Sequence, residues 1–130
     1  MKIPVRVYYQ DTDAGGVVYH AQYLAFMERA RTELLIASGL DLARVVAEHG
    51  VLFMVHHIEI TFHQPARLND LLSVSAEVAK MGRASLVFRQ QVERDGTLLV
   101  QADVSVALVD RERLKPARMP RELTQAFTPT

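Results

Sequence analysis

Apolar residues recur with a helical period in the first third of the chain. Between residues 21 and 38 they return every three or four positions, which predicts one amphipathic helix that buries a single stripe. Gly39 can end this helix in a left-handed conformation, and Asp41 can cap a shorter helix that reaches His49 and Gly50. The predicted stripe of the long helix consists of Tyr23, Phe26, Met27, Ala30, Leu34 and Ala37.

Segments rich in β-branched and aromatic residues predict five strands around these helices. One strand, Ile3 to Tyr9, precedes the long helix, and four follow the shorter one. Asp95 and Gly96 stand between two alternating runs and strongly indicate a two-residue hairpin. We therefore predict an α+β fold in which a curved, antiparallel, five-stranded sheet, its last four strands in a meander, wraps around one long helix. The four later strands are predicted at residues 53–63, 71–80, 84–94 and 97–109.

The last predicted strand is apolar on both faces near its end, although one helix covers only one face of a sheet. An uncovered apolar face needs a partner subunit against it or along its edge, so the pattern predicts a homo-oligomer. Along this strand Val104, Val106 and Leu108 point to one face, and Ser105, Ala107 and Val109 point to the other.

Length and composition narrow the class of protein. A chain of 130 residues fits a single domain, 1–130, whose last residues, 126–130, we expect to fray. Fifteen basic residues balance fifteen acidic ones, so the net charge attracts neither nucleic acid nor an anionic membrane over long range. The chain lacks cysteine, a secretion signal and any apolar run near the roughly 20 residues of a membrane span. We expect a cytoplasmic protein without membrane insertion.

Residues with reactive side chains gather between the first strand and the long helix. Asp11, Asp13, two glycines and His20 occupy this stretch. Backbone N–H groups at a helix start lack intrahelical partners, so near His20 they can polarise a carbonyl group and stabilise its oxyanion. A carboxylate seven residues upstream can act as a base or a nucleophile towards the same carbonyl carbon. Together these groups suit acyl transfer.

The motif Tyr-Tyr-x-Asp-Thr-Asp-Ala-Gly-Gly-Val-Val-Tyr-His at residues 8–20 resembles the YbgC-type acyl-CoA thioesterases, in the 4-hydroxybenzoyl-CoA thioesterase branch of the hotdog-fold superfamily. The resemblance continues at residues 26–31, 65–70, 82–86 and 115–120, and so covers nearly the whole chain. It implies a hotdog fold, dimers that join their sheets edge to edge, often homotetramers, and active sites at the subunit interface. It also implies hydrolysis of small or fatty acyl-CoA to free acid and CoA without a cofactor.

Carried over by position, the resemblance implies roles for seven residues. Asp13 matches the catalytic carboxylate, and the motif leaves open whether it acts as a nucleophile or as a general base towards water. The backbone N–H of His20 would polarise the thioester carbonyl, its imidazole would orient water or substrate, and Tyr9 would line the same site. The residues that would contact the phosphates and pantetheine of CoA are Arg83, Ser85, Lys115 and Arg118.

For the other polar residues, the sequence favours structural roles over catalytic or metal-binding ones. Asp11 suits the stabilisation of a turn, and Glu28, beside the apolar stripe, suits an ordinary helix partner better than a second acid. Strand geometry separates the histidines of the second predicted strand, which favours a solvated polar face over a metal site, and we expect no metal. These strand residues are His56, His57, Glu59 and His63.

Two other functions fit the same fold. One is an acyl-thioester hydratase or dehydratase, which releases no free thiol. The other is a non-catalytic module that binds acyl carrier protein or envelope-associated partners and keeps the pocket for acyl chains. The intact Asp13 favours hydrolysis over the binding module. The sequence leaves open the acyl group, and also whether CoA or acyl carrier protein carries it.

Overall fold

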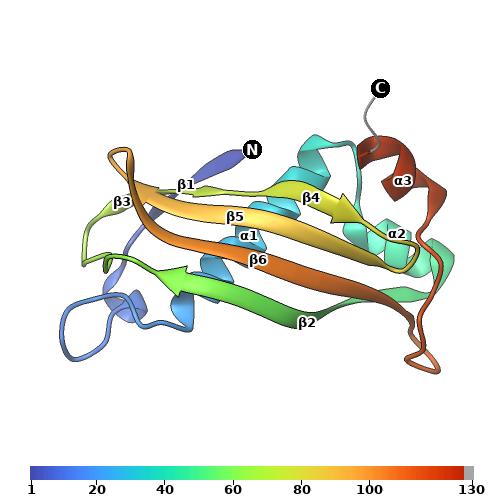
Figure 1. Ribbon diagram of the computed structural model, residues 1–130, viewed down its shortest axis with the longest axis horizontal. Coiled ribbons are helices and arrows are strands. Elements are labelled where there is room, and N and C mark those ends of the chain that lie inside the picture. Colours follow the sequence, from blue (N-terminus) through green and yellow to red (C-terminus); the bar gives the residue numbers. More distant parts are fainter. Residues whose placement is uncertain (128–130) are drawn as a thin grey trace.

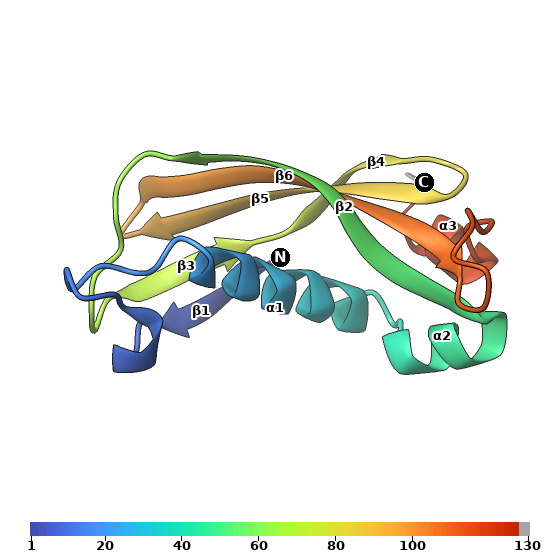
Figure 2. The same ribbon diagram turned by 90° about the horizontal axis from the view of Figure 1, so that it is seen from below.

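A long helix lies along one face of a curved antiparallel sheet in the computed structural model, which describes residues 1–127 (Figures 1 and 2). Figure 2 shows α1 on one side of the sheet, with α2 and α3 gathered at one end. This arrangement confirms the predicted α+β class. The elements are β1 (Lys2–Arg6), the 3₁₀ helix η1 (Tyr9–Asp11), α1 (Gln22–Ala37), α2 (Leu42–His49), β2 (Val51–Phe62), β3 (Leu71–Ser75), β4 (Glu77–Met81), β5 (Ser85–Arg94), β6 (Thr97–Asp110) and α3 (Arg121–Phe127).

The predicted apolar stripe of α1 forms the centre of the core. Phe26, Met27 and Ala30 are fully buried between the helix and the sheet. In the last turn Leu35 is buried and Ala37 is exposed, the reverse of the prediction, because α1 meets α2 there as well as the sheet. The burial of these large side chains supplies much of the driving force for folding.

The end of α1 and both ends of α2 are set by local signals in the sequence. Gly39, just after α1, has a φ of 83°, a left-handed conformation that glycine adopts without steric cost. The Asp41 carboxylate accepts the Arg44 N–H at 3.3 Å and so caps α2. Gly50, with a φ of 63°, ends α2 in the same way that Gly39 follows α1.

The strand order in the sheet is β1-β3-β5-β6-β2, with β4 paired to β5, so the predicted meander is wrong. β5 and β6 do form the predicted hairpin, in which Asp95 and Gly96 have φ values of 49° and 79°. However, β2 pairs with β6 rather than with β3, the next strand in the chain. The segment 63–70 therefore crosses the sheet instead of making a tight turn. Alternation of apolar residues assigns the faces of a strand but not its neighbours.

The segment predicted as one strand, 71–80, forms two strands, so the sheet has six strands rather than five. The interruption lies opposite Gln90 and Gln91 of β5. The Gln91 N–H donates to Ser75 Oγ at 3.0 Å, and the Gln90 side-chain amide donates to the Ser75 carbonyl at 3.1 Å. Side-chain hydrogen bonds thus replace the regular ladder at this point, which the periodicity of the sequence does not reveal.

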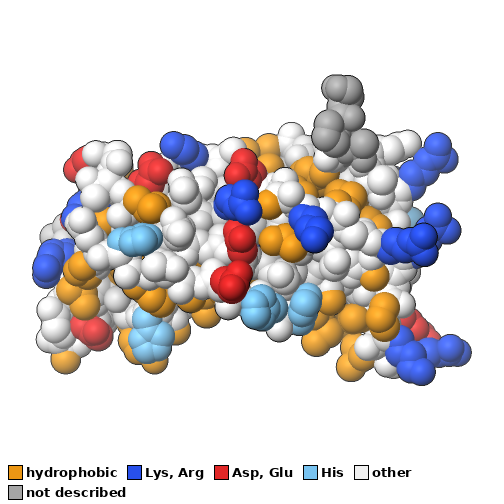
Figure 3. All heavy atoms as spheres, in the orientation of Figure 1, with side chains coloured by type: hydrophobic (Ala, Val, Ile, Leu, Met, Phe, Trp, Pro, Cys, Tyr) orange, Lys and Arg blue, Asp and Glu red, His pale blue; other side chains and the backbone are white. Residues whose placement is uncertain are grey.

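The sheet face opposite α1 is polar across its middle. The strand registers place Glu77, Arg89, Asp103 and Glu59 in one row across four strands. Figure 3 shows acidic and basic side chains aligned across this face. Arg89 Nε lies 3.2 Å from Asp103 Oδ1. A polar sheet face is stable in water, so the middle of this face needs no partner subunit to cover it.

The tail of the chain covers the apolar end of β6. Val109 bridges to Pro116, and the Ala117 N–H donates to the Leu108 carbonyl at 2.9 Å. Val109 is consequently buried. The apolar end of β6 from which we predicted a homo-oligomer is therefore covered at Val109 by the chain's own tail and does not by itself require a partner subunit.

The last helix includes two of the residues that we predicted to fray. Ala126 and Phe127, which we expected to fray, belong to α3, and Phe127 packs against the core. The rest of the predicted frayed end, residues 128–130, lies outside the described part of the chain. Among residues 1–127, no helix is long and apolar enough to cross a membrane.

Candidate active site

A buried aspartate anchors the segment between β1 and α1. Asp11 is 3% exposed, and its carboxylate accepts the Tyr8 N–H at 2.8 Å and the Gln22 side-chain amide at 2.9 Å. The Asp11 carbonyl accepts the Tyr19 N–H at 3.0 Å. Because both ends of the segment bind this one residue, Asp11 has the structural role that its short side chain indicated.

Asp13 lies in a tight turn that projects from this anchor. Thr12 bridges to Val18, and the Asp13 N–H donates to the Val17 carbonyl at 2.9 Å. Asp13 Oδ1 accepts the Gly15 N–H at 2.8 Å, and a Cβ atom at Gly15 would lie 3.3 Å from the same oxygen. The Asp13 side chain is exposed, and no basic side chain within residues 1–127 forms an ion pair with it. The turn thus presents a carboxylate held by one backbone donor.

His20 lies just before α1 and offers a backbone donor. The N–H groups of Tyr19 and Gln22 are used within the fold: Tyr19 donates to Asp11, and Gln22 donates to the Tyr19 carbonyl at 2.8 Å. The Ala21 N–H has no backbone acceptor within residues 1–127. In the part of the chain that the structure describes, the His20 N–H has no backbone acceptor. Its imidazole is exposed, and the ring centroid lies 4.4 Å from that of Tyr19. A donor of this kind at a helix start can stabilise an oxyanion.

Exposed aromatic and apolar side chains surround this turn. The Val18 N–H donates to the Ala66 carbonyl at 2.9 Å, and the Ala66 N–H donates to the Tyr23 hydroxyl at 2.9 Å. The Tyr23 ring centroid lies 5.6 Å from that of Phe62, at the end of β2. Sequence reasoning missed the contact of Ala66 with Val18 and that of Phe62 with Tyr23 because each joins segments that are distant in the chain. The exposed side chains are Tyr8, Tyr9, Tyr19, Phe62 and Leu68.

An ion pair fixes the crossing segment 63–70 on which the turn rests. Arg94 Nη1 lies 2.8 Å from Asp70 Oδ2, and the Arg67 N–H donates to the same oxygen at 2.8 Å. Burial by itself raises the pKa of Asp70, but these donors and the charges of both arginines outweigh it and lower that pKa below its usual value. Burial raises the pKa of Tyr23, so this hydroxyl keeps its proton. Asp70 and Tyr23, which support the turn, therefore keep the same protonation state around neutral pH.

The residues expected to contact CoA lie at the other end of the molecule. Arg83 and Arg118 line a groove of about 900 Å³, where the Met119 N–H donates to the Arg83 carbonyl at 2.7 Å. Ser85 begins β5 next to this groove, and Lys115 is exposed on the adjoining tail. Figures 1 and 2 show the β4–β5 turn and this tail at one end of the sheet, and the segment between β1 and α1 at the other. The Asp13 turn and this basic groove thus lie at opposite ends of the same protomer.

The histidines of β2 do not gather into a metal site. The register of β2 shifts between Val55 and His57, so His56 lies in an irregularity of the strand. Within residues 1–127, the one group of three His, Asp or Glu residues with ligand atoms within 4.8 Å of one another consists of Glu48, His49 and Glu122. Sequence reasoning missed this group because Glu122 lies 73 residues after His49.

A curved sheet wrapped around one helix, with a carboxylate-bearing turn before that helix, defines a hotdog-fold protein of the α+β class. A family model of the thioesterase superfamily matches residues 15–101. The chain is 46% identical over 125 residues to the acyl-CoA thioester hydrolase YbgC of Escherichia coli O6:H1. This alignment covers 95% of this chain and 92% of that protein. It is 45% identical over 124 residues to the acyl-CoA thioesterase YbgC of Haemophilus influenzae, with 95% and 91% covered.

Solved structures show the same relationship. A probable thioesterase from Bartonella henselae superposes with a TM-score of 0.85 at 38% identity, covering 92% of this chain and 98% of that one. The chain therefore belongs to the thioesterase superfamily and, within it, to the YbgC-type acyl-CoA thioesterases. This membership confirms the family resemblance of the motifs, the hotdog fold, and the prediction of a thioester-hydrolysing enzyme.

Proposed function

We propose that this chain hydrolyses acyl-CoA thioesters with Asp13 as its catalytic carboxylate. The observation that carries the proposal is the turn at residues 12–18, in which Asp13 Oδ1 accepts the Gly15 N–H while the side chain remains exposed before α1. The YbgC relatives, named as acyl-CoA thioester hydrolase and acyl-CoA thioesterase, support the same reaction because they are similar over nearly the whole chain.

The reaction needs a polarised carbonyl group and an attacking oxygen atom. The N–H of His20 donates to the thioester carbonyl and stabilises the negative charge that develops there. Asp13 either attacks the carbonyl carbon, forming a mixed anhydride that water cleaves, or removes a proton from water that attacks directly. In both routes the C–S bond breaks, the thiol leaves with a proton, and one water molecule is consumed. The imidazole of His20 orients water or substrate, and Tyr9 lines the site.

We propose that the complete site forms between two subunits. In one protomer Tyr9 is 82% exposed, and Asp13 and His20 are exposed as well, whereas acyl transfer gains from the exclusion of water. β2 is a twelve-residue edge strand with exposed Met54 and Val55, which suits pairing with a second copy. Such pairing supports a homodimer, and the predicted homotetramer is its doubling.

A two-fold axis at the middle of β2 joins the separated parts of the site. Antiparallel pairing of two copies of β2 turns one protomer end for end, which moves its basic groove towards the other protomer's Asp13 turn. Arg83 and Arg118 then bind the CoA phosphates, with Ser85 and Lys115 beside them. The acyl group lies against the exposed aromatic side chains near Phe62.

Replacing Asp13 by asparagine tests the catalytic assignment. Asn keeps an oxygen that accepts the Gly15 N–H, but it is neither a base nor a nucleophile. We expect thiol release from a panel of acyl-CoA substrates to fall about 10²- to 10⁴-fold. Asp103→Asn, on the helix-free sheet face, is the matched control and should retain activity. Equal turnover by Asp13→Asn and wild type contradicts the assignment, and an absorbance change of an enoyl substrate without thiol release indicates a hydratase.

Subunit complementation tests the shared site. Asp13→Asn and a double variant, Arg83→Ala with Arg118→Ala, each damage every site of their own homodimers at low substrate concentration. Co-expression of both chains forms heterodimers in which one of the two sites is intact, so about a quarter of wild-type activity should return after random pairing. No activity above the sum of the two separate variants would show that each protomer carries its site alone.

A further inference from the structure

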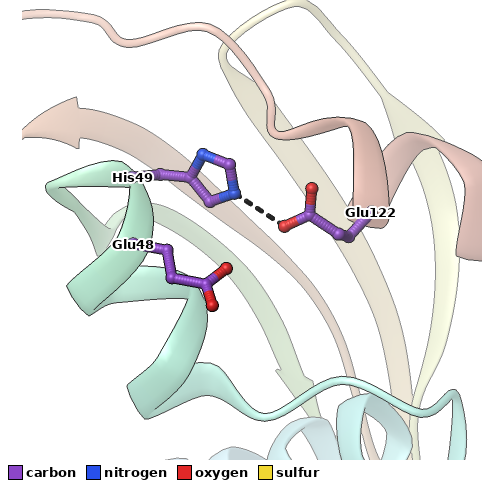
Figure 4. Close-up of side chains that lie close together, drawn as sticks. All are labelled: Glu48, His49 and Glu122. Carbon is purple, nitrogen blue, oxygen red and sulfur yellow. Dashed lines mark hydrogen bonds and ion pairs between the residues drawn. The ribbon is translucent and has the colours of Figure 1, made fainter.

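Three side chains with metal-binding atoms converge far from the Asp13 turn. Glu48 and His49 end α2, and Glu122 stands in the first turn of α3. His49 Nε2 lies 2.6 Å from Glu122 Oε2, and one ligand atom from each of the three residues lies within 4.8 Å of the others. Figure 4 shows the imidazole and both carboxylates directed into the same space between the two helices.

The donor set favours a transition metal over calcium or magnesium. One imidazole nitrogen and two carboxylate oxygens are ligands that Zn²⁺ accepts, at about 2.0 to 2.2 Å each, with water at the fourth position. Calcium and magnesium prefer oxygen ligands alone. The three donor atoms already lie within 4.8 Å of one another, and a common ion would draw them closer together. We propose that Glu48, His49 and Glu122 bind Zn²⁺ or a similar divalent transition metal ion.

A metal ion bound at the cluster would compete with Arg44 for the carboxylate of Glu48. Glu48 and Glu122 are both acidic and exposed, and the nearby base is Arg44, whose Nε lies 2.8 Å from Glu48 Oε1. A bound ion takes the place of Arg44 at Glu48 and of the direct contact between His49 and Glu122. Removal of Arg44 should therefore strengthen metal binding, whereas removal of any ligand should weaken it.

The bound ion cross-links α2 and α3. α3 also contributes Thr124 to the lining of the basic groove, which Arg83 lines as well. The metal site is therefore a structural clamp that holds the C-terminal helix beside this groove. It takes no part in the proposed chemistry at Asp13.

Zinc titration of the full-length protein, freed of metal by a chelator, tests the proposal by calorimetry and thermal unfolding at neutral pH. We expect one ion per chain, a rise in Tm with Zn²⁺ but not with Mg²⁺, and binding weaker by about tenfold or more in His49→Ala and Glu122→Gln. Arg44→Gln should bind more tightly than wild type. His63→Ala replaces an exposed histidine outside both the cluster and β2; it is the control and should bind as wild type does.

Two results would overturn the site. One is the absence of saturable zinc binding by a folded wild-type protein. The other is unchanged binding in both His49→Ala and Glu122→Gln, with circular dichroism showing that they fold. Glu48→Gln provides a further ligand variant if either of these is unstable. Thioesterase activity plays no part in the readout, so failure of the metal site leaves the proposed hydrolysis untouched.

Discussion

Replacing Gly15 by alanine tests how the turn positions the carboxylate of Asp13. A Cβ atom at Gly15 would lie 3.3 Å from Asp13 Oδ1, tighter than ordinary van der Waals contact. The carboxylate must therefore move by a few tenths of an ångström, and the Gly15 N–H that holds it moves out of line. Gly15 does not have a positive φ, so alanine introduces no backbone strain of its own.

The expected effect of Gly15→Ala falls on the reaction rate rather than on stability. A displacement of 1 Å at a reacting group costs about 10²-fold, so a few tenths of an ångström should lower kcat about three- to tenfold. Because Asp13 is exposed and can move, the free energy of unfolding should change by less than about 0.5 kcal/mol. Steady-state thiol release and urea unfolding measure the two quantities.

Gly39→Ala is the matched control because we expect it to lower stability and to leave kcat unchanged, the opposite of Gly15→Ala. Nothing lies within 4 Å of the added methyl group, but φ is 83°, so alanine should cost about 1 kcal/mol of stability and leave kcat unchanged. If Gly15→Ala retains the wild-type kcat while Asp13→Asn is inactive, the close contact does not position the carboxylate. Our reasoning on the turn would then be refuted.

Two further predictions concern stability. Gln90→Met leaves an α1 carbonyl and the half-buried Arg31 guanidinium without the partners they have at 2.9 Å, so the free energy of unfolding should fall by about 2 to 4 kcal/mol in urea titrations. Gln91→Met is the control, and a loss below about 0.5 kcal/mol at Gln90 would contradict the argument. Asp70→Asn should cost about 1 to 2 kcal/mol at pH 7 through its contact with Arg94. Because folding lowers the pKa of Asp70, the difference should vanish as the pH falls below about 4, and a pH-independent difference would refute it.

Local signals in the sequence were sufficient wherever a few neighbouring residues decide the conformation. The spacing of Phe26, Met27 and Ala30 predicted the buried face of α1, because a helix repeats every 3.6 residues whatever surrounds it. Asp95 and Gly96 predicted their hairpin because few residue pairs tolerate two positive φ values. The segment from Asp13 to His20 is contiguous, so its place between a strand and a helix was also predictable.

The sequence by itself thus determined α1, α2, the hairpin and the candidate catalytic turn, since these depend on steric preferences within a few residues, but it did not predict α3. Only the tertiary structure decided that β2 pairs with β6, that Arg83 and Arg118 line a groove remote from Asp13, and that Glu122 meets His49. Each of these depends on packing between segments that are distant in the chain. A local pattern of apolar and polar residues defines which side of an element is buried, but not which other element covers it.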